Sequence, residues 1–413
     1  MRKALINCSL LLRKYSEMRF YNGMNPFRSF ATFLLLVLSF SLTAIAGPAP
    51  KDGKYFFYVG TYTGNGSSSK GIYVYRYDAA TQEITSLGLA AETTSPSFIA
   101  PSPNGRFVYA VNELGDYKGP NSGGVSAFSI DKATGKLTFL NEVQSRGAGP
   151  CYITVDRTGK WVLVANYDGG SNAVFPVLAD GKLGEASSFV QHTGHGADPK
   201  RQEAPHAHSI DLSLDNRFAY VDDLGLDELL VYKFDASKGT LTPNDPPYAK
   251  LDPGSGPRHF ALASSGKFAY VVSEIKGTVT VFSNDPNTGK LSTLQTVSTQ
   301  AEGFKGEIED AEVEIHPSGK FLYASNRGDG NSIAVFAIDA AKGTLTPVEV
   351  TPTQGKAPRH FMFDPTGTLL LAENMSSNNV VVFRIDQKTG KLTPTGKTFE
   401  VGQPVCLKFL AAE

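Results

Sequence analysis

"FSIDKATGKLT", residues 128–138, recurs along the chain with small changes and decides the fold class. The pattern is the end of an apolar strand, an aspartate, a short turn and the start of another strand. Self-similarity at a period of roughly 50 residues is typical of repeat architectures. Six clear copies and one degenerate copy cover the chain after residue 50, and they begin at Tyr75, Phe128, Phe175 (the degenerate copy), Tyr232, Phe282, Phe336 and Phe383.

Each copy follows two further strand patterns. In "PRHFALASSGKFAYVVSE", residues 257–274, two apolar runs flank a Ser-Ser-Gly turn, which is a hairpin signal. Four antiparallel strands in roughly 50 residues are one blade of a propeller. No helical period of useful length follows residue 50. The sequence therefore predicts an all-β, seven-bladed β-propeller of four-stranded antiparallel blades, in one domain over residues 47–413.

The two ends of this domain complement each other. "KYFFYVGTYT", residues 54–63, reads as a second strand without a first, and "PVCLKFL", residues 404–410, reads as a first strand without a second. Together they complete one blade and remove the free edges of an open array. We expect N- and C-terminal strands to close the ring.

Composition and motifs exclude several function classes. Lys plus Arg number 39 against 40 Asp plus Glu, and the basic residues are dispersed, so we expect no nucleic-acid partner. The chain has neither a phosphate-binding Gly-rich loop nor a Gly-x-Ser-x-Gly elbow. We expect no cofactor, a small-molecule ligand and a monomer.

Residues 1–46 differ from the rest. An apolar run over 29–46 follows Arg28 and ends in Ala44-Ile45-Ala46, a pattern that signal peptidase accepts. We expect export to the periplasm or beyond, with no stable membrane insertion after cleavage. An uncleaved anchor is the alternative, and residues 1–23 could lie upstream of a true start at Met24. Cys151 and Cys406 remain in the mature chain, and sequence alone cannot pair them.

At two positions of the aligned repeats, the type of side chain differs from blade to blade. One is the start of each innermost strand, and the other is the end of each second strand. Antiparallel pairing brings these positions to the same height, at one mouth of the channel. Variation on a constant scaffold marks a site. The first column holds Ser97, Cys151, His208, Arg258, Ala311 and Arg359, and the second includes Glu113, Asp223, Glu274 and Arg327.

The candidate site combines imidazole, carboxylate and guanidinium groups. Arginine binds carboxylate or phosphate in a bidentate fork, and Glu and His can supply a general base and a general acid. We therefore predict a site for a small anionic ligand. Its catalytic candidates are His208, Glu274, Arg258 and Arg327, and its substrate-binding candidates are His206, Arg201, Arg359, Asp223 and Glu113.

Several neighbouring residues have a structural interpretation. The recurring Asn112, Asn166, Asn326 and Asn374 favour local backbone hydrogen bonds. Glu113 is either a site carboxylate or a salt-bridge partner. His259 and His360 each follow an arginine of the first column, so strand alternation predicts that they point away from the channel.

The segment 191–209, "QHTGHGADPKRQEAPHAHS", interrupts the repeat and carries four of the seven histidines. Metal binding is one interpretation, but His-rich loop spacing without a nearby carboxylate or cysteine is a weak zinc signal. We expect no metal. The favoured interpretation is a loop that closes over the cavity and delivers His208 and Arg201.

With the repeats aligned, the chain resembles the seven-bladed propeller lactonases, the family of the propeller-type 6-phosphogluconolactonase and the fungal carboxymuconate cyclase. The resemblance covers residues 54–410. It is carried by "YVGTYT" at Tyr58, "RQEAPHAHS" at Arg201, "DDLGLDELLVY" at Asp222, "GPRH" at Gly256, "VVSE" at Val271 and "ASNRG" at Ala324. It implies metal-independent chemistry on a sugar or carboxylic lactone, with His208, Arg258, Glu274 and Arg327 as the matching cyclase residues.

This resemblance leads to a mechanistic hypothesis. Arg258 and Arg327 hold the substrate's anionic group and the developing charge, Glu274 activates water, and His208 protonates the leaving alkoxide. Export argues against 6-phosphogluconolactone, a cytoplasmic metabolite, as the physiological substrate, and an unphosphorylated aldonolactone or an aromatic-degradation lactone is the alternative. The alternative function is a non-catalytic exported propeller that binds a small anionic ligand or a protein at the same mouth.

Overall fold

The computed structural model describes residues 53–64 and 66–412. These residues belong to one compact unit, Ala49–Glu413. The predicted signal segment, residues 1–46, lies outside the described residues. Within the described ranges, no helix has the length and apolar character needed to cross a membrane.

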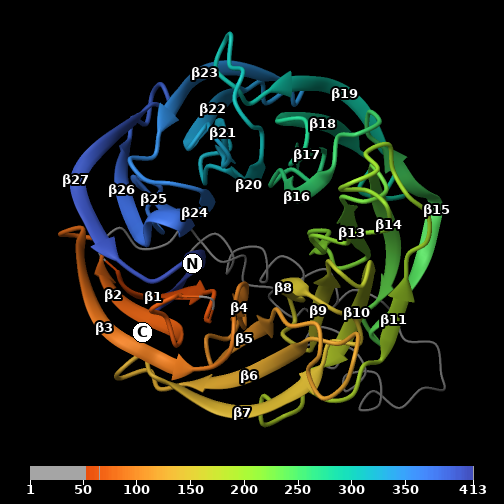
Figure 1. Ribbon diagram of the computed structural model, residues 1–413, viewed down its shortest axis with the longest axis vertical. Coiled ribbons are helices and arrows are strands. Elements are labelled where there is room, and N and C mark those ends of the chain that lie inside the picture. Colours follow the sequence, from red (N-terminus) through yellow and green to blue (C-terminus); the bar gives the residue numbers. More distant parts are fainter. Residues whose placement is uncertain (1–52, 65, 413) are drawn as a thin grey trace, which may run out of the picture. The chain divides into compact units, whose positions relative to one another are not determined.

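The described residues form seven four-stranded antiparallel sheets around a central channel (Figure 1), which confirms the predicted propeller. One 3-10 turn, η1 (Met375–Ser377), follows the second strand of the last sheet. From the innermost to the outermost strand, the blades are β28 (Pro404–Ala411), β1 (Lys54–Thr61), β2 (Gly71–Asp78) and β3 (Glu83–Glu92); β4 (Ile99–Pro101), β5 (Phe107–Asn112), β6 (Gly124–Ile130) and β7 (Leu137–Gln144); β8 (Pro150–Val155), β9 (Trp161–Asn166), β10 (Ser171–Pro176) and β11 (Ser188–Gln191); β12 (Asp211–Leu212), β13 (Phe218–Asp223), β14 (Glu228–Asp235) and β15 (Thr240–Lys250); β16 (Pro257–Leu262), β17 (Phe268–Ser273), β18 (Thr278–Asn284) and β19 (Leu291–Ser298); β20 (Asp310–Ile315), β21 (Phe321–Asn326), β22 (Ser332–Ile338) and β23 (Leu345–Pro352); and β24 (Pro358–Phe363), β25 (Leu369–Asn374), β26 (Asn379–Ile385) and β27 (Leu392–Glu400).

The repeated Asp-turn-Gly phrase connects neighbouring blades. In its turn at 131–135, the Gly135 amide donates to the Asp131 carbonyl at 2.7 Å, and Gly135 has a φ of +73°. The Gly135 carbonyl then accepts a hydrogen bond from the Tyr58 hydroxyl of the preceding blade at 3.0 Å. Glycine suits this turn because its φ is left-handed and a Cβ there would lie 2.9 Å from the Phe56 ring. Equivalent tyrosine contacts to glycine carbonyls are Tyr109 to Gly181, Tyr270 to Gly343 and Tyr323 to Gly390.

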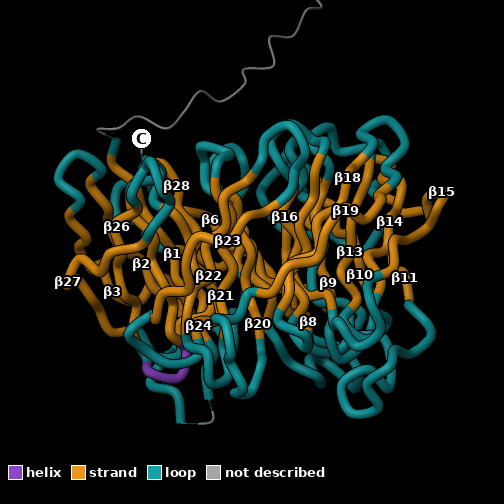
Figure 2. Tube along the Cα trace, turned by 90° about the horizontal axis from the view of Figure 1, so that it is seen from above, coloured by secondary structure: helices purple, strands orange, loops and turns teal. Residues whose placement is uncertain are grey.

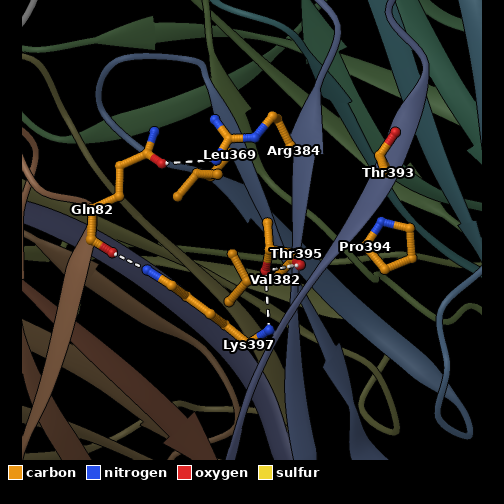
Figure 3. A pocket seen from close by; sticks show the side chains of 8 residues that line it. All are labelled: Gln82, Leu369, Val382, Arg384, Thr393, Pro394, Thr395 and Lys397. Carbon is orange, nitrogen blue, oxygen red and sulfur yellow. Dashed lines mark hydrogen bonds between the residues drawn. The ribbon is translucent and has the colours of Figure 1, made fainter.

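The ring closes as predicted. β28 pairs with β1 in antiparallel register, so the first blade takes its innermost strand from the end of the chain. On the outer side, Gln82 holds the seam between the last and first blades: its carbonyl accepts from Lys397 Nζ at 2.9 Å, and its side-chain oxygen accepts from Arg384 (Figure 3). Its side-chain nitrogen donates to the Thr368 hydroxyl. These contacts join residues about 300 positions apart, so they stabilise the closed ring.

Five of the innermost strands depart from a regular pleat, and one of them is β28, where Cys406 pairs with Gly60 and Pro404 with Thr61. The register of β16 shifts between Pro257 and His259, and that of β24 shifts between Pro358 and His360. Corresponding shifts occur in β8 and β20. A bulge of this kind leaves one extra residue on the inner strand and re-aims its side chain. It brings two successive side chains toward the channel, which matters for the site.

Candidate functional site

The mouth layer of side chains lies where the innermost strands start and the second strands end. Asn374, at the end of β25, pairs with Pro358 at the start of β24, and η1 follows Asn374 directly. Figure 2 shows η1 at the bottom, so the mouth layer belongs to that face of the propeller. The four predicted catalytic residues meet in this layer, and each is at most 4% exposed.

Glu274 is the centre of the cluster. Its Oε2 accepts from Arg258 Nη1 at 2.6 Å and from Arg327 Nη2 at 2.8 Å, while Oε1 bonds Arg201. Burial alone would raise the pKa of this carboxyl, but the charges of Arg327, Arg258 and Arg201 outweigh it and hold the pKa far below its usual range. Glu274 is therefore a fixed anion that holds three guanidiniums together.

His208 lies beside this ion cluster. Its Nε2 contacts Nη1 of Arg258 and is 3.9 Å from Glu274 Oε2. Burial, together with the charge of Arg258, lowers the pKa of His208 well below its ordinary value, so the ring is neutral at pH 7. Arginine can only donate, so Nε2 is the acceptor nitrogen and the single ring proton is on Nδ1.

Backbone contacts fix the two buried arginines of the neighbouring blades. Arg258 Nε donates to the Ala311 carbonyl at 3.0 Å, which ties β16 to β20. Arg327 lies within 3.4 Å of the Asp310 carbonyl and 3.3 Å of Glu309 Oε1. Burial, aided by the charge of Arg258, lowers the pKa of Arg327 to about 10, so the side chain remains charged at neutral pH.

The loop between β11 and β12 delivers His208 and Arg201, as the sequence predicts. Arg201 ion-pairs with Glu274 although its side chain is 39% exposed, so it is the outermost guanidinium of the cluster. Gln202 anchors the loop by donating to the Leu224 carbonyl at 2.8 Å and to Asp227 at 2.7 Å. Arg201 and His208 are the two residues of this segment that reach the ion cluster.

Two substrate-binding candidates on this side have different surroundings. His206 stacks on Tyr167, with ring centroids 4.5 Å apart, and forms part of the mouth wall. Asp223 does not reach the mouth. It is fully buried, and its two oxygens accept from His192 at 2.6 Å and from the His206 amide at 2.8 Å. The prediction that Asp223 contacts substrate is wrong, because its carboxylate anchors the loop.

Arg359 and Glu113 line the mouth from the last and second blades. The Arg359 guanidinium lies 5.3 Å from the Tyr62 ring centroid, and the Tyr62 hydroxyl donates to Glu113 at 2.9 Å. Burial alone would lower the pKa of Arg359, but Tyr62, Glu113 and Glu274 keep it above its ordinary value. Glu113 is therefore both a mouth carboxylate and a partner of Tyr62.

The recurring asparagines have the structural role that the sequence predicts. Asn112 Nδ2 donates to the Thr94 carbonyl at 2.6 Å, and its Oδ1 accepts from Ser126. Asn326 Nδ2 donates to the Thr299 carbonyl and to the Ser332 hydroxyl. These amides connect each second strand to the neighbouring loop and third strand.

The prediction for His259 and His360 is wrong, because both lie in the channel. His259 stacks edge-on against Phe98 and Tyr152 of other blades and pairs with Glu312 Oε1 at 3.0 Å. His360 contacts Phe98, Glu312 and Glu373. The bulges in β16 and β24 direct each histidine inward along with its arginine, so the channel holds a second polar layer beneath the mouth.

The four histidines of the 191–209 segment do not gather. His192 pairs with Asp223, His195 is exposed, and His206 and His208 contact Tyr167 and Arg258. Within residues 53–64 and 66–412, no group of three or more His, Cys, Asp or Glu side chains has the arrangement of a metal site.

The arrangement combines a positive clamp with a neutral imidazole. Four arginines face three carboxylates, Glu274, Glu113 and Glu309, so the mouth can bind an anion and stabilise an oxyanion. Sequence reasoning did not select Tyr62, Tyr167 and Cys151, although the last two stand in the aligned columns. The pocket in Figure 3, of about 220 Å³, lies at the outer seam and includes none of these residues.

Comparison with known proteins shows which family and which solved structures this chain is similar to. The family model described as "Lactonase, 7-bladed beta-propeller" matches residues 56–409. A 6-phosphogluconolactonase of Bacillus subtilis is 38% identical over 357 residues, covering 86% of this chain and 99% of that protein. A 6-phosphogluconolactonase of Formosa agariphila is 34% identical, covering 78% and 90%. The structure of a periplasmic gluconolactonase of Pseudomonas aeruginosa has a TM-score of 0.81 at 35% identity, covering 87% and 100%.

Proposed function

The chain belongs to the seven-bladed β-propeller lactonase family and is a lactonase, and from this premise we propose that it hydrolyses a sugar-acid lactone at the mouth built around Glu274. The observation that supports this most directly is the neutral His208 beside a clamp of three arginines. A lactone carbonyl develops negative charge when water adds to it, and prearranged cationic donors stabilise that charge.

The charge of the mouth favours a substrate with an anionic group. Arg201, Arg258, Arg327 and Arg359 outnumber the carboxylates that face them. Phosphate and carboxylate both match the donor fork of arginine. The relatives named 6-phosphogluconolactonase make 6-phosphogluconolactone the first candidate, and gluconolactone is the uncharged comparison.

We assign the general base to His208 rather than to Glu274. Both oxygens of Glu274 are occupied by arginines, and its depressed pKa makes it a weak base. Nε2 of neutral His208 carries the electron pair that a base needs, and this pair accepts from Arg258 until Arg258 turns to the substrate's developing oxyanion. In this mechanism Glu274 holds Arg258 and Arg327 in place, which revises the role that the sequence suggests for it.

The reaction follows from these assignments. Nε2 of His208 takes a proton from water as the water oxygen bonds to the lactone carbonyl carbon, and Arg258 and Arg327 stabilise the resulting oxyanion. The bond between that carbon and the ring oxygen then breaks, and the proton on Nε2 passes to the ring oxygen. The product is the open hydroxy acid, and His208 returns to its neutral form.

The test compares the rate at which the protein hydrolyses each of two lactones with the spontaneous rate of the same lactone. Purified mature protein is incubated with 6-phosphogluconolactone and with gluconolactone, and acid release is followed in a weakly buffered pH-indicator assay. We expect catalysis with both and a higher kcat/KM for the phosphorylated lactone. His208→Gln serves as the matched inactive variant. Rates equal to the spontaneous rate with both compounds would favour the non-catalytic, ligand-binding alternative.

Export and oligomeric state are part of the proposal. The predicted signal segment and the similarity to a periplasmic gluconolactonase support an exported enzyme. We propose that it acts as a monomer, because all the mouth residues come from one chain. Fractionation of cells that express the full chain, with immunodetection of the mature form, tests the location.

A further inference from the structure

Cys151 occupies the same structural position in its blade as His208, Arg258 and Arg359 do in theirs. It stands at the start of β8 and is 4% exposed. Its Sγ lies 3.5 Å from Nδ1 of His208, on the side of the ring opposite Arg258. The same sulfur is 3.4 Å from the His208 carbonyl and 3.8 Å from the Ala207 carbonyl. The described contacts leave the thiol no other polar partner.

The proton positions follow from the donors and acceptors present. Arg258 donates to Nε2 of His208, so the ring proton is on Nδ1 and points at Cys151 Sγ. The thiol can then donate its own proton to the His208 or Ala207 carbonyl. Every hydrogen of the pair has a partner in this arrangement. The reverse tautomer would place two donors against each other at Nε2.

We propose that Cys151 is a positioning residue for His208: its sulfur accepts the Nδ1 proton and holds the imidazole with Nε2 facing the arginines and the substrate. This inference rests on the proposed function for its kinetic consequence, but not for the tautomer itself. A base oriented by a third group is the recurring arrangement of hydrolytic sites.

A thiol suits this position better than a carboxylate. An aspartate at 3.5 Å would stabilise the imidazolium and hold the proton that must leave Nε2 in the second half of the reaction. Burial and the nearby Glu113 raise the pKa of the Cys151 thiol, so it stays neutral and accepts without adding charge. His208 therefore remains a weak base that releases its proton readily to the ring oxygen.

The test uses Cys151→Ala and Cys151→Ser, with Cys406→Ala as the matched control. Cys406 is the second buried free cysteine of the described part of the chain, and its contact is with the Ile99 carbonyl. We expect Cys151→Ala to lower kcat about tenfold with KM nearly unchanged, because general base catalysis by a misoriented imidazole loses part of its 10²–10⁴-fold contribution. Cys151→Ser keeps an acceptor and should restore most of kcat. Cys406→Ala should change stability but not kcat.

The tautomer is measured directly by ¹⁵N NMR of histidine-labelled, ligand-free protein, with the His208 signal assigned by its loss in His208→Gln. We expect a protonated Nδ1 and an unprotonated Nε2 at pH 7. A protonated Nε2, or a kcat for Cys151→Ala equal to that of the wild type, would overturn the proposal. A thioester found by mass spectrometry during turnover would also overturn it, because Cys151 would then be the nucleophile. If the wild type hydrolyses no lactone, the NMR result still decides the tautomer.

Discussion

Replacing Glu274 by Gln tests whether this carboxylate is the counter-charge of the mouth. The change keeps the shape of the side chain and removes the charge that three arginines share. Removing one partner of a buried ion pair costs about 3–5 kcal/mol. Unfolding entropy of about 2.1 cal/mol/K per residue gives roughly 0.8 kcal/mol/K for a unit of this length, Ala49–Glu413, so Tm should fall by about 4–6 °C.

Calorimetry or dye-monitored melting at pH 7 measures this shift, and sulfate titration measures its reversal. We expect sulfate to stabilise Glu274→Gln more than the wild type, because an added anion can replace the lost carboxylate. The control is Glu309→Gln. Its side chain is 37% exposed and 3.3 Å from Arg327, so removal should cost under about 1 kcal/mol. A Tm for Glu274→Gln within 1 °C of the wild type, with no extra sulfate effect, would refute the counter-charge role.

Three further predictions follow from the site. Burial and the charge of Arg258 lower the pKa of His208, so kcat/KM should stay flat through the range where a free imidazole titrates, near 6.5, and fall only at lower pH, where the ring gains a proton. An acid limb at the pH of a free imidazole contradicts this. Burial raises the pKa of Asp310 to about 8, so the folded protein keeps a proton that the unfolded chain releases near pH 4, and the free energy of unfolding therefore falls as pH rises from about 4 to 8. Asp310→Asn should raise Tm at pH 7.5 but not at pH 4. An equal change in Tm at both pH values counts against this prediction. Arg201→Gln should raise KM for an anionic lactone about tenfold and leave kcat within about threefold of the wild-type value, because it removes one partly exposed charge-assisted contact. Steady-state kinetics measure both constants, and Lys200→Gln, at an exposed neighbouring position, is the control.

The sequence predicts the architecture because the strand and turn pattern of one blade recurs several times along the chain. Four copies of the Asp-turn-Gly phrase receive a tyrosine hydroxyl from the neighbouring blade, as Gly135 does from Tyr58. Closure was readable from the incomplete strand sets at the two ends, residues 54–63 and 404–410. Both signals reflect contacts between strands or between neighbouring blades, so they are visible in the sequence pattern.

The site was predictable in part. His208, Arg258, Glu274 and Arg327 were found because their columns vary while the strands do not. His259 and His360 were placed on the wrong side of their strands, because alternation assumes a regular pleat and both strands have a bulge after the proline. Asp223 was misplaced for another reason: its partner His192 lies in an irregular loop whose path no periodicity describes.

Because β28 pairs with β1, the ring around the mouth can close only after β28 has been synthesised. β28 is made last, so a growing chain with all its other strands still exposes one edge of β1 and has a gap in the inner wall. Lys408, which lies over Phe98 in the channel, is missing until then. A carboxypeptidase that trimmed the chain back to Gln403 would remove none of His208, Arg258, Glu274 and Arg327, yet it would open the ring and disturb the cluster that those residues form.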